Sequence, residues 1–111
     1  MYFNKGKLNR MCKSFRNKQV TVTYEHNDSQ GGHQVRDAVF TYDAFVIRDV
    51  MGYYLVEFHR DGKLVFEQEF NNDWEFIGHG KLKLWNSGPY CYFTMKCYSF
   101  WRELHEAIFT K

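Results

Sequence analysis

The sequence has only one proline and three cysteines among its 111 residues. So little proline excludes a collagen-like repeat and a proline-rich linker. Three cysteines cannot all pair within the chain, whereas the disulfide frameworks of small secreted proteins use even numbers. We therefore expect the protein to be in a reducing, cytoplasmic compartment.

Long apolar runs are also absent. The longest uncharged apolar stretch, residues 50–56, is too short to cross a bilayer. Positive charge near the N-terminus is not followed by the apolar run of a secretory signal, because Asn9 and Arg10 interrupt it. The sequence therefore predicts neither a transmembrane segment nor a signal peptide.

No motif of a familiar catalytic or cofactor site is present. The chain has no GxGxxG, Walker-type, GxSxG or HExxH pattern, and the spacing from Cys91 to Cys97 is not a common zinc spacing. We expect no cofactor, no metal ion and no catalytic residue. The enzymatic alternative is a carboxylate–histidine site on one sheet face. That site would consist of Glu57, Glu67, Glu69 and His59.

Aromatic residues, in contrast, are unusually frequent. The chain contains 11 Phe, 8 Tyr and 3 Trp, which is 20% of its residues. Its length is that of one domain, which we assign to residues 1–111. One core of this size can hardly bury so many rings completely, so several should reach the surface. Exposed rings can anchor a protein interface or stack on unpaired bases.

Charge lies in blocks that the net charge of +2 conceals. Residues 25–75 carry a net charge of −7, and residues 76–111 carry +3. Residues 1–18 contain no acidic residue and form a basic N-terminal segment of charge +6. Such asymmetry indicates either mutual neutralisation in the fold or a segment that binds a separate partner. The basic residues of this segment are Lys5, Lys7, Arg10, Lys13, Arg16 and Lys18.

The periodicity of apolar residues predicts an α+β fold. Residues 7–16 and 99–109 have helical spacing, and much of residues 19–96 alternates as strands do. We expect a mainly antiparallel sheet of five to seven strands, with a short N-terminal helix and a C-terminal helix packed on the sheet. The apolar face of the first helix would consist of Leu8, Met11, Cys12 and Phe15.

Residues 53–70 predict a β-hairpin with two possible registers. A two-residue turn of Asp61 and Gly62 would mix acidic and apolar side chains on one face. A three-residue loop, with Gly62 in the left-handed conformation, shifts the pairing by one residue and separates them. We therefore expect the second register. Its apolar face would consist of Tyr54, Val56, Phe58, Leu64, Phe66 and Phe70, and its polar face of Glu57, His59, Lys63, Glu67 and Glu69.

The absence of catalytic motifs, the excess of aromatic residues and the acidic block favour a small non-enzymatic protein-binding module. Such a module would act as an inhibitor or regulator of a larger macromolecule. The motif-free, aromatic-rich composition resembles that of accessory proteins encoded by bacteriophages, which implies action on a host factor. The binding surface would consist of Glu57, Glu67, Glu69, Tyr53, Leu55 and Val65.

Two other partners fit the same sequence. Exposed apolar residues on the binding surface could instead form a homodimer. The six basic residues of the N-terminal segment could bind nucleic acid, with exposed aromatic rings stacking on bases. The acidic block opposes nucleic-acid binding, because it would repel a polyanion held close to it.

Overall fold

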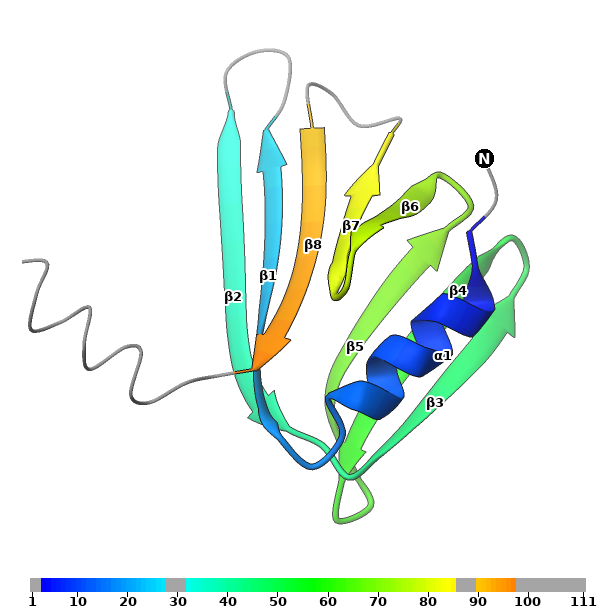
Figure 1. Cartoon of the computed structure of the whole chain (residues 1–111), viewed down its shortest axis with the longest axis vertical. Helices are drawn as coiled ribbons and strands as arrows, with labels where there is room; N and C mark the ends of the chain where they lie inside the picture. The colour runs from blue at the N-terminus through cyan, green and yellow to red at the C-terminus, as the bar shows by residue number, and fades with distance from the viewer. Residues whose placement is uncertain (1–2, 28–31, 86–89, 98–111) are drawn as a thin grey trace, which may run out of the picture.

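The computed structural model describes residues 3–27, 32–85 and 90–97, and this part of the chain forms one helix and eight strands (Figure 1). Every strand pairs with its neighbours in the antiparallel direction. The helix is α1 (Lys5–Ser14). The strands are β1 (Gln19–Asn27), β2 (His33–Thr41), β3 (Ala44–Val50), β4 (Tyr53–Arg60), β5 (Lys63–Asn71), β6 (Trp74–Gly78), β7 (Lys81–Leu84) and β8 (Tyr90–Cys97).

The strands form two sheets, so the expectation of one sheet with five to seven strands was wrong. One sheet has the order β2-β1-β8-β7-β6 and the other the order β3-β4-β5. The chain changes sheet between β2 and β3 and again between β5 and β6. The short strand β6 has no regular alternation of buried and exposed side chains. The helix expected at 99–109 lies outside the described residues.

Helix α1 begins and ends two residues earlier than the expected range of 7–16. The side chain of Asn4 caps it by accepting a hydrogen bond from the backbone N–H of Lys7 at 3.0 Å. The expected apolar stripe is buried, so the helix packs its apolar face into the core. At its end, the buried hydroxyl of Tyr42 donates to the carbonyl of Cys12 at 2.6 Å. No described helix has the length and apolar character needed to cross a membrane.

The β4–β5 hairpin places most side chains on the expected faces, but its turn and its register were predicted wrongly, because a three-residue loop would place Phe58 opposite Leu64. Asp61 and Gly62 form a two-residue turn with φ angles of +52° and +78°. A bulge at Val65 then shifts the pairing by one residue, so that Phe58 lies opposite Phe66. Tyr54, Val56, Phe58, Phe66 and Phe70 therefore face the core as predicted. Leu64 lies before the bulge and is 49% exposed, so its place on the apolar face was wrong.

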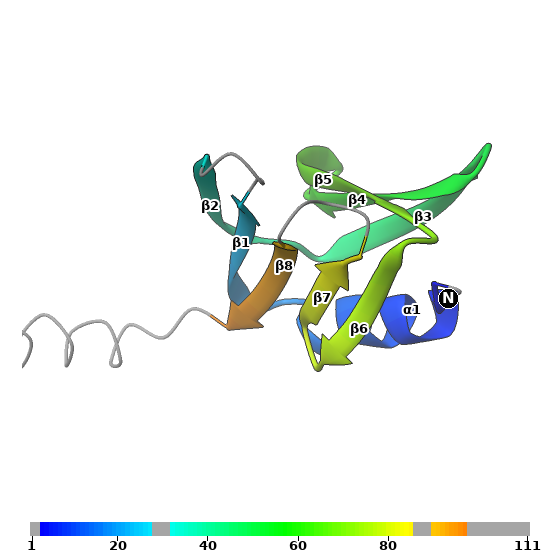
Figure 2. The same cartoon turned by 90° about the horizontal axis from the view of Figure 1, so that it is seen from above.

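The core lies between the two sheets and is rich in aromatic rings. Figure 2 shows the three-stranded sheet on one side, with the five-stranded sheet and α1 opposite it. Phe70 packs edge-on against both Trp74 and Phe93, and it stacks on Phe3. The remaining core residues include Leu8, Met11, Cys12, Val20, Val22, Tyr42, Val56, Phe58, Leu82, Cys91 and Met95. Much of the aromatic excess is thus used in joining two separate sheets.

The β6–β7 turn places Gly80 directly against the backbone of β8. Gly80 is buried, has a φ of +73°, and accepts a hydrogen bond from the backbone N–H of Met95 at 2.7 Å. A Cβ at this position would lie 2.2 Å from the carbonyl oxygen of Met95. Both the space and the left-handed conformation therefore require glycine.

Candidate protein-binding surface

All six residues of the predicted binding surface lie on the three-stranded sheet. The pairing places Val46, Glu57 and Glu67 in one row across β3, β4 and β5. Arg48, Leu55 and Glu69 form the next row. Because side chains alternate along a strand, these rows face away from the buried Val56 and Phe70. We define the outer face as Val46, Arg48, Tyr53, Leu55, Glu57, Val65, Glu67 and Glu69.

The outer face carries apolar side chains that are open to solvent. Val46 is 41% exposed and Val65 is 40% exposed, while Leu55 and Tyr53 are partly exposed. Among the described residues, no helix or strand packs over this face, because α1 and the five-stranded sheet lie on the opposite side (Figure 2). The bulge adds Val65 to this side of the hairpin. The outer face is therefore an uncovered surface with an apolar centre.

Its acidic residues differ in their surroundings. Arg48 on β3 donates to the Glu57 carboxylate at 2.5 Å, and the Glu57 side chain is only 17% exposed. This ion pair offsets the repulsion between Glu57 and Glu67, which lie directly opposite each other. Glu67 and Glu69 are exposed and form no ion pair with another described residue. The outer face therefore has a negative edge along β5.

The carboxylate–histidine arrangement lies on this same open face. His59 lies two residues after Glu57 on β4 and pairs with Ala44 on β3. The carboxylate that it adjoins is already bound by Arg48. A catalytic site generally needs a concave pocket that excludes water. Glu57 and His59 stand on the outer side of the sheet, whereas Glu67 and Glu69 also line the two hollows described next.

A groove that the sequence did not indicate runs beside the outer face. It has a volume of about 460 Å³ and lies between β2 and β5, each of which pairs with a neighbouring strand on one side only. The two sheets diverge here, as Figure 1 shows, and the groove forms where they separate. The angle between two sheets leaves no local pattern in the sequence, so the groove could not be predicted from it. The groove is lined by Val22, Tyr24, His26, Arg36, Asp37, Ala38, Phe66, Glu67 and Gln68.

A second hollow of about 480 Å³ continues along the same side of β5 and shares Tyr24 and Gln68 with the first. Burial and a hydrogen bond with Cys91 raise the pKa of Tyr24 to about 12, so its hydroxyl stays protonated at neutral pH. Three outer-face residues also line these hollows: Tyr53, Glu67 and Glu69. The outer face and the groove therefore meet along β5.

Met51 is a further surface residue that the sequence did not single out. It lies in the β3–β4 turn beside the second hollow, is 98% exposed, and has a φ of +22°. A fully exposed methionine is typical of adaptable binding surfaces, because its flexible side chain fits partners of different shape.

The six basic residues of the N-terminal segment lie elsewhere on the molecule. All six are exposed on α1 or just after it, and none forms an ion pair with a described acidic residue. Lys5 lies over the ring of Tyr54 at 5.7 Å. The helix thus docks on the core by its apolar face and keeps its charge in solvent. Of the two alternatives for the charge blocks, neutralisation by ion pairs with the described acidic residues is not seen for this segment.

Comparison with protein-family models, with curated proteins and with solved structures finds no match, so the function of these surfaces has to be inferred from their own chemistry.

Proposed function

We propose that this chain is a protein-binding module whose partner covers the outer face and reaches over β5 into the groove. The observation that supports this most is the meeting of two features along one free strand edge. An uncovered sheet face with exposed valines adjoins the groove, which Glu67 also lines, and the second hollow, which Tyr53 and Glu69 also line. Interfaces combine an apolar centre with polar groups that orient the partner.

The chemistry of the surface defines the kind of partner. Glu67 and Glu69 call for basic residues on the partner, because their carboxylates have no ion pair among the described residues. Val46, Val65 and Met51 supply apolar area that contact would remove from water. The free edge of β5 offers backbone groups to an extended segment. Such a module would regulate or inhibit its partner by occupying its surface.

A second copy of the chain is a poorer partner for the same face. In a symmetric dimer each outer face would meet another outer face. With the two-fold axis perpendicular to the strands, the negative edges along β5 would approach each other, and like charges disfavour such contacts. A different protein with a basic surface avoids this cost.

Site-specific crosslinking in the source cell tests the proposal. A photoreactive amino acid replaces Val46 on the outer face, and in a matched variant it replaces Ile77, which is 45% exposed on β6 of the five-stranded sheet and lines neither the groove nor the second hollow. We expect position 46 to crosslink to a defined protein that position 77 does not reach. Crosslinks only to a second copy would assign the face to a homodimer. Identical products from both positions, or none from position 46, would refute the proposal.

A further inference from the structure

We propose that the groove between α1 and the β6–β7 turn binds the phosphate groups of a nucleic acid strand. This groove has a volume of about 370 Å³ and lies apart from the outer face. It is cationic, since two basic side chains and no carboxylate line it. Its lining consists of Lys7, Arg10, Met11, Phe76, Ile77, Gly78, His79 and Gly80.

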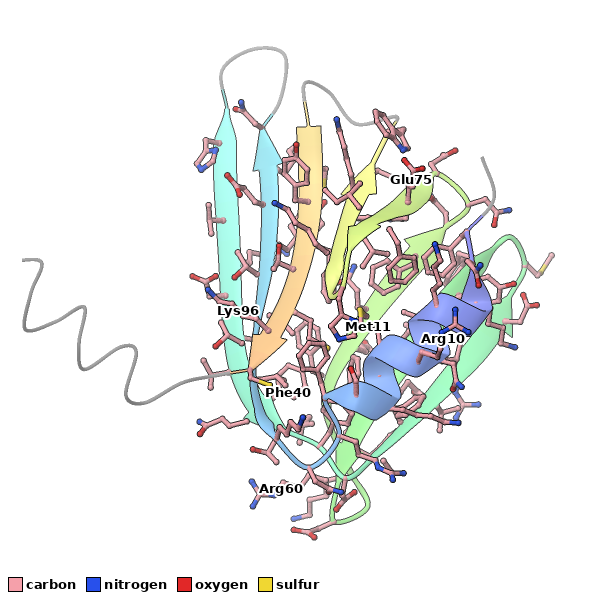
Figure 3. All side chains as sticks on the ribbon, viewed as in Figure 1. Arg10, Met11, Phe40, Arg60, Glu75 and Lys96 are labelled. Atoms are coloured by element: carbon pink, nitrogen blue, oxygen red, sulfur yellow. The ribbon has the colours of Figure 1, made fainter. Side chains whose placement is uncertain are left out.

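Two cations form one wall of the groove. Lys7 and Arg10 lie one turn apart on α1, and both are exposed. Figure 3 shows Arg10 on the outward side of the helix, whereas Met11 points toward the core. Neither cation has an ion pair with a described acidic residue, and residues 1–18 contain no acid at all. Their charge is therefore available to an anion from outside.

The β6–β7 turn forms the other wall and holds a fixed polar group. The His79 ring stacks on Phe15 with the ring centres 5.2 Å apart, and its Nε2 lies 3.1 Å from the Ser14 hydroxyl. Gly78 precedes it and is exposed, so its backbone is open to solvent, whereas Gly80 is buried against β8. Lys81 follows immediately and is exposed. Arginine, lysine and polar groups around an accessible backbone are the usual contacts to phosphate oxygens.

Helix stability does not explain the lysines at this place. The positive end of a helix dipole lies at its N-terminus, where lysine is unfavourable and acidic residues are preferred. The first turn of α1 contains Lys5 and Lys7 and no acidic residue. Lys7 occupies the third helical position after the Asn4 cap, where glutamate would complete a capping box. Binding of an anion accounts for a residue that the helix itself disfavours.

Nucleic acid fits this surface better than a membrane does. An interfacial helix inserts its apolar side chains among lipids. The apolar residues of α1 are instead buried in the core, where Leu8 and Cys12 have no exposed area. The sequence also raised the objection that the acidic block would repel a polyanion. Glu57, Glu67 and Glu69 of that block lie on the outer face, away from α1 (Figure 2).

Fluorescence anisotropy with labelled single-stranded DNA and RNA of mixed sequence tests the proposal. We compare the full chain with the double variant Lys7→Glu/Arg10→Glu. The matched control is Arg60→Glu/Lys63→Glu, which makes the same charge change at the exposed β4–β5 turn. Vesicles of phosphatidylserine form a separate arm. Thermal unfolding of each variant confirms that it is folded, and we expect Lys7→Glu not to lower the melting temperature.

We expect the wild-type protein and the control variant to bind the oligonucleotides with an affinity that falls as salt rises. The α1 double variant should bind more weakly by about tenfold or more, and its salt slope should fall by about 0.7 for each phosphate that the altered side chains no longer neutralise. If both double variants weakened oligonucleotide binding equally, the net charge of the protein and not the groove would determine binding, and the proposal would be wrong. No binding at low salt, or binding to vesicles but not to oligonucleotides, would overturn the proposal.

Discussion

Single residues fix where this chain can turn, and Gly80 is the strictest case. Replacing it with alanine would force a Cβ to within 2.2 Å of the Met95 carbonyl oxygen and would place that residue at a φ of +73°. We expect Gly80→Ala to lower the free energy of unfolding by about 3 kcal/mol or more. Urea unfolding followed by tryptophan fluorescence measures this change.

Gly62→Ala is the matched control. Gly62 has a similar φ of +78°, but a Cβ there meets no atom within 4 Å. Only the left-handed conformation is then disfavoured, so the expected loss is about 1–2 kcal/mol. Equal losses for the two variants would show that β8 does not approach Gly80 as closely as described.

Cys12 couples folding to alkaline pH. Burial raises the pKa of its thiol from 9.0 to about 12 in the folded protein. Below pH 9 the thiol is neutral in both states, so its full contribution to stability is present. Between pH 9 and about 12 the unfolded chain releases the proton while the folded protein keeps it. The free energy of unfolding should therefore fall by about 1 kcal/mol per pH unit from this group.

Unfolding measured across this pH range checks the Cys12 prediction. The variant Cys12→Ala removes the titrating group, so its stability should fall less steeply above pH 9 than that of the wild-type protein. The absolute stabilities will differ because the substitution leaves a cavity, and only the slopes are compared. If the free energy of unfolding fell with the same slope above pH 9 in both proteins, Cys12 would not be buried as described.

At the scale of elements, the turn and the bulge of the β4–β5 hairpin together decide which side chains reach the core. The two-residue turn leaves Leu64 49% exposed opposite His59, and the bulge that follows returns Phe66 to the side of Phe58, which is 1% exposed. We expect Phe58→Ala to lower the free energy of unfolding by about 3–5 kcal/mol. Leu64→Ala should cost less than about 1 kcal/mol, as exposed substitutions usually do. Similar costs would place Leu64 in the core, as a three-residue loop would, and would contradict the two-residue turn of Asp61 and Gly62.

Elements with strong local signals were predictable from the sequence. The helical spacing of Leu8, Met11, Cys12 and Phe15 identified α1 and its buried face. Alternation along β4 and β5 identified the outer face, because a strand's faces follow from its order of residues. The second sheet and β6 were not predictable. They depend on bends such as the one at Tyr42 and Asp43, which are set by tertiary packing and leave no periodic trace.

At the scale of the whole molecule, the candidate site also has parts that the sequence predicts and parts that depend on tertiary packing. The outer face was predictable, whereas the groove beside it was not, because it forms between two sheets that diverge. Met51 was not predictable either, because a turn residue has no periodicity. The sequence likewise indicated that basic and acidic blocks exist, but only the fold places α1 and the outer face on opposite sides (Figure 2). The two proposed binding surfaces therefore do not overlap.

The central claim is that the outer face is the binding surface. Its most direct test is to measure the affinity of the crosslinked partner for two charge-reversal variants. Glu67→Lys changes the outer face, whereas Asp49→Lys makes the same charge change at an exposed residue that pairs with Tyr54 and so projects from the opposite face. We expect Glu67→Lys to raise Kd by about tenfold or more, which is about 1.4 kcal/mol, and Asp49→Lys to change it less than about twofold. Equal effects of the two substitutions, or a larger effect of Asp49→Lys, would contradict the account.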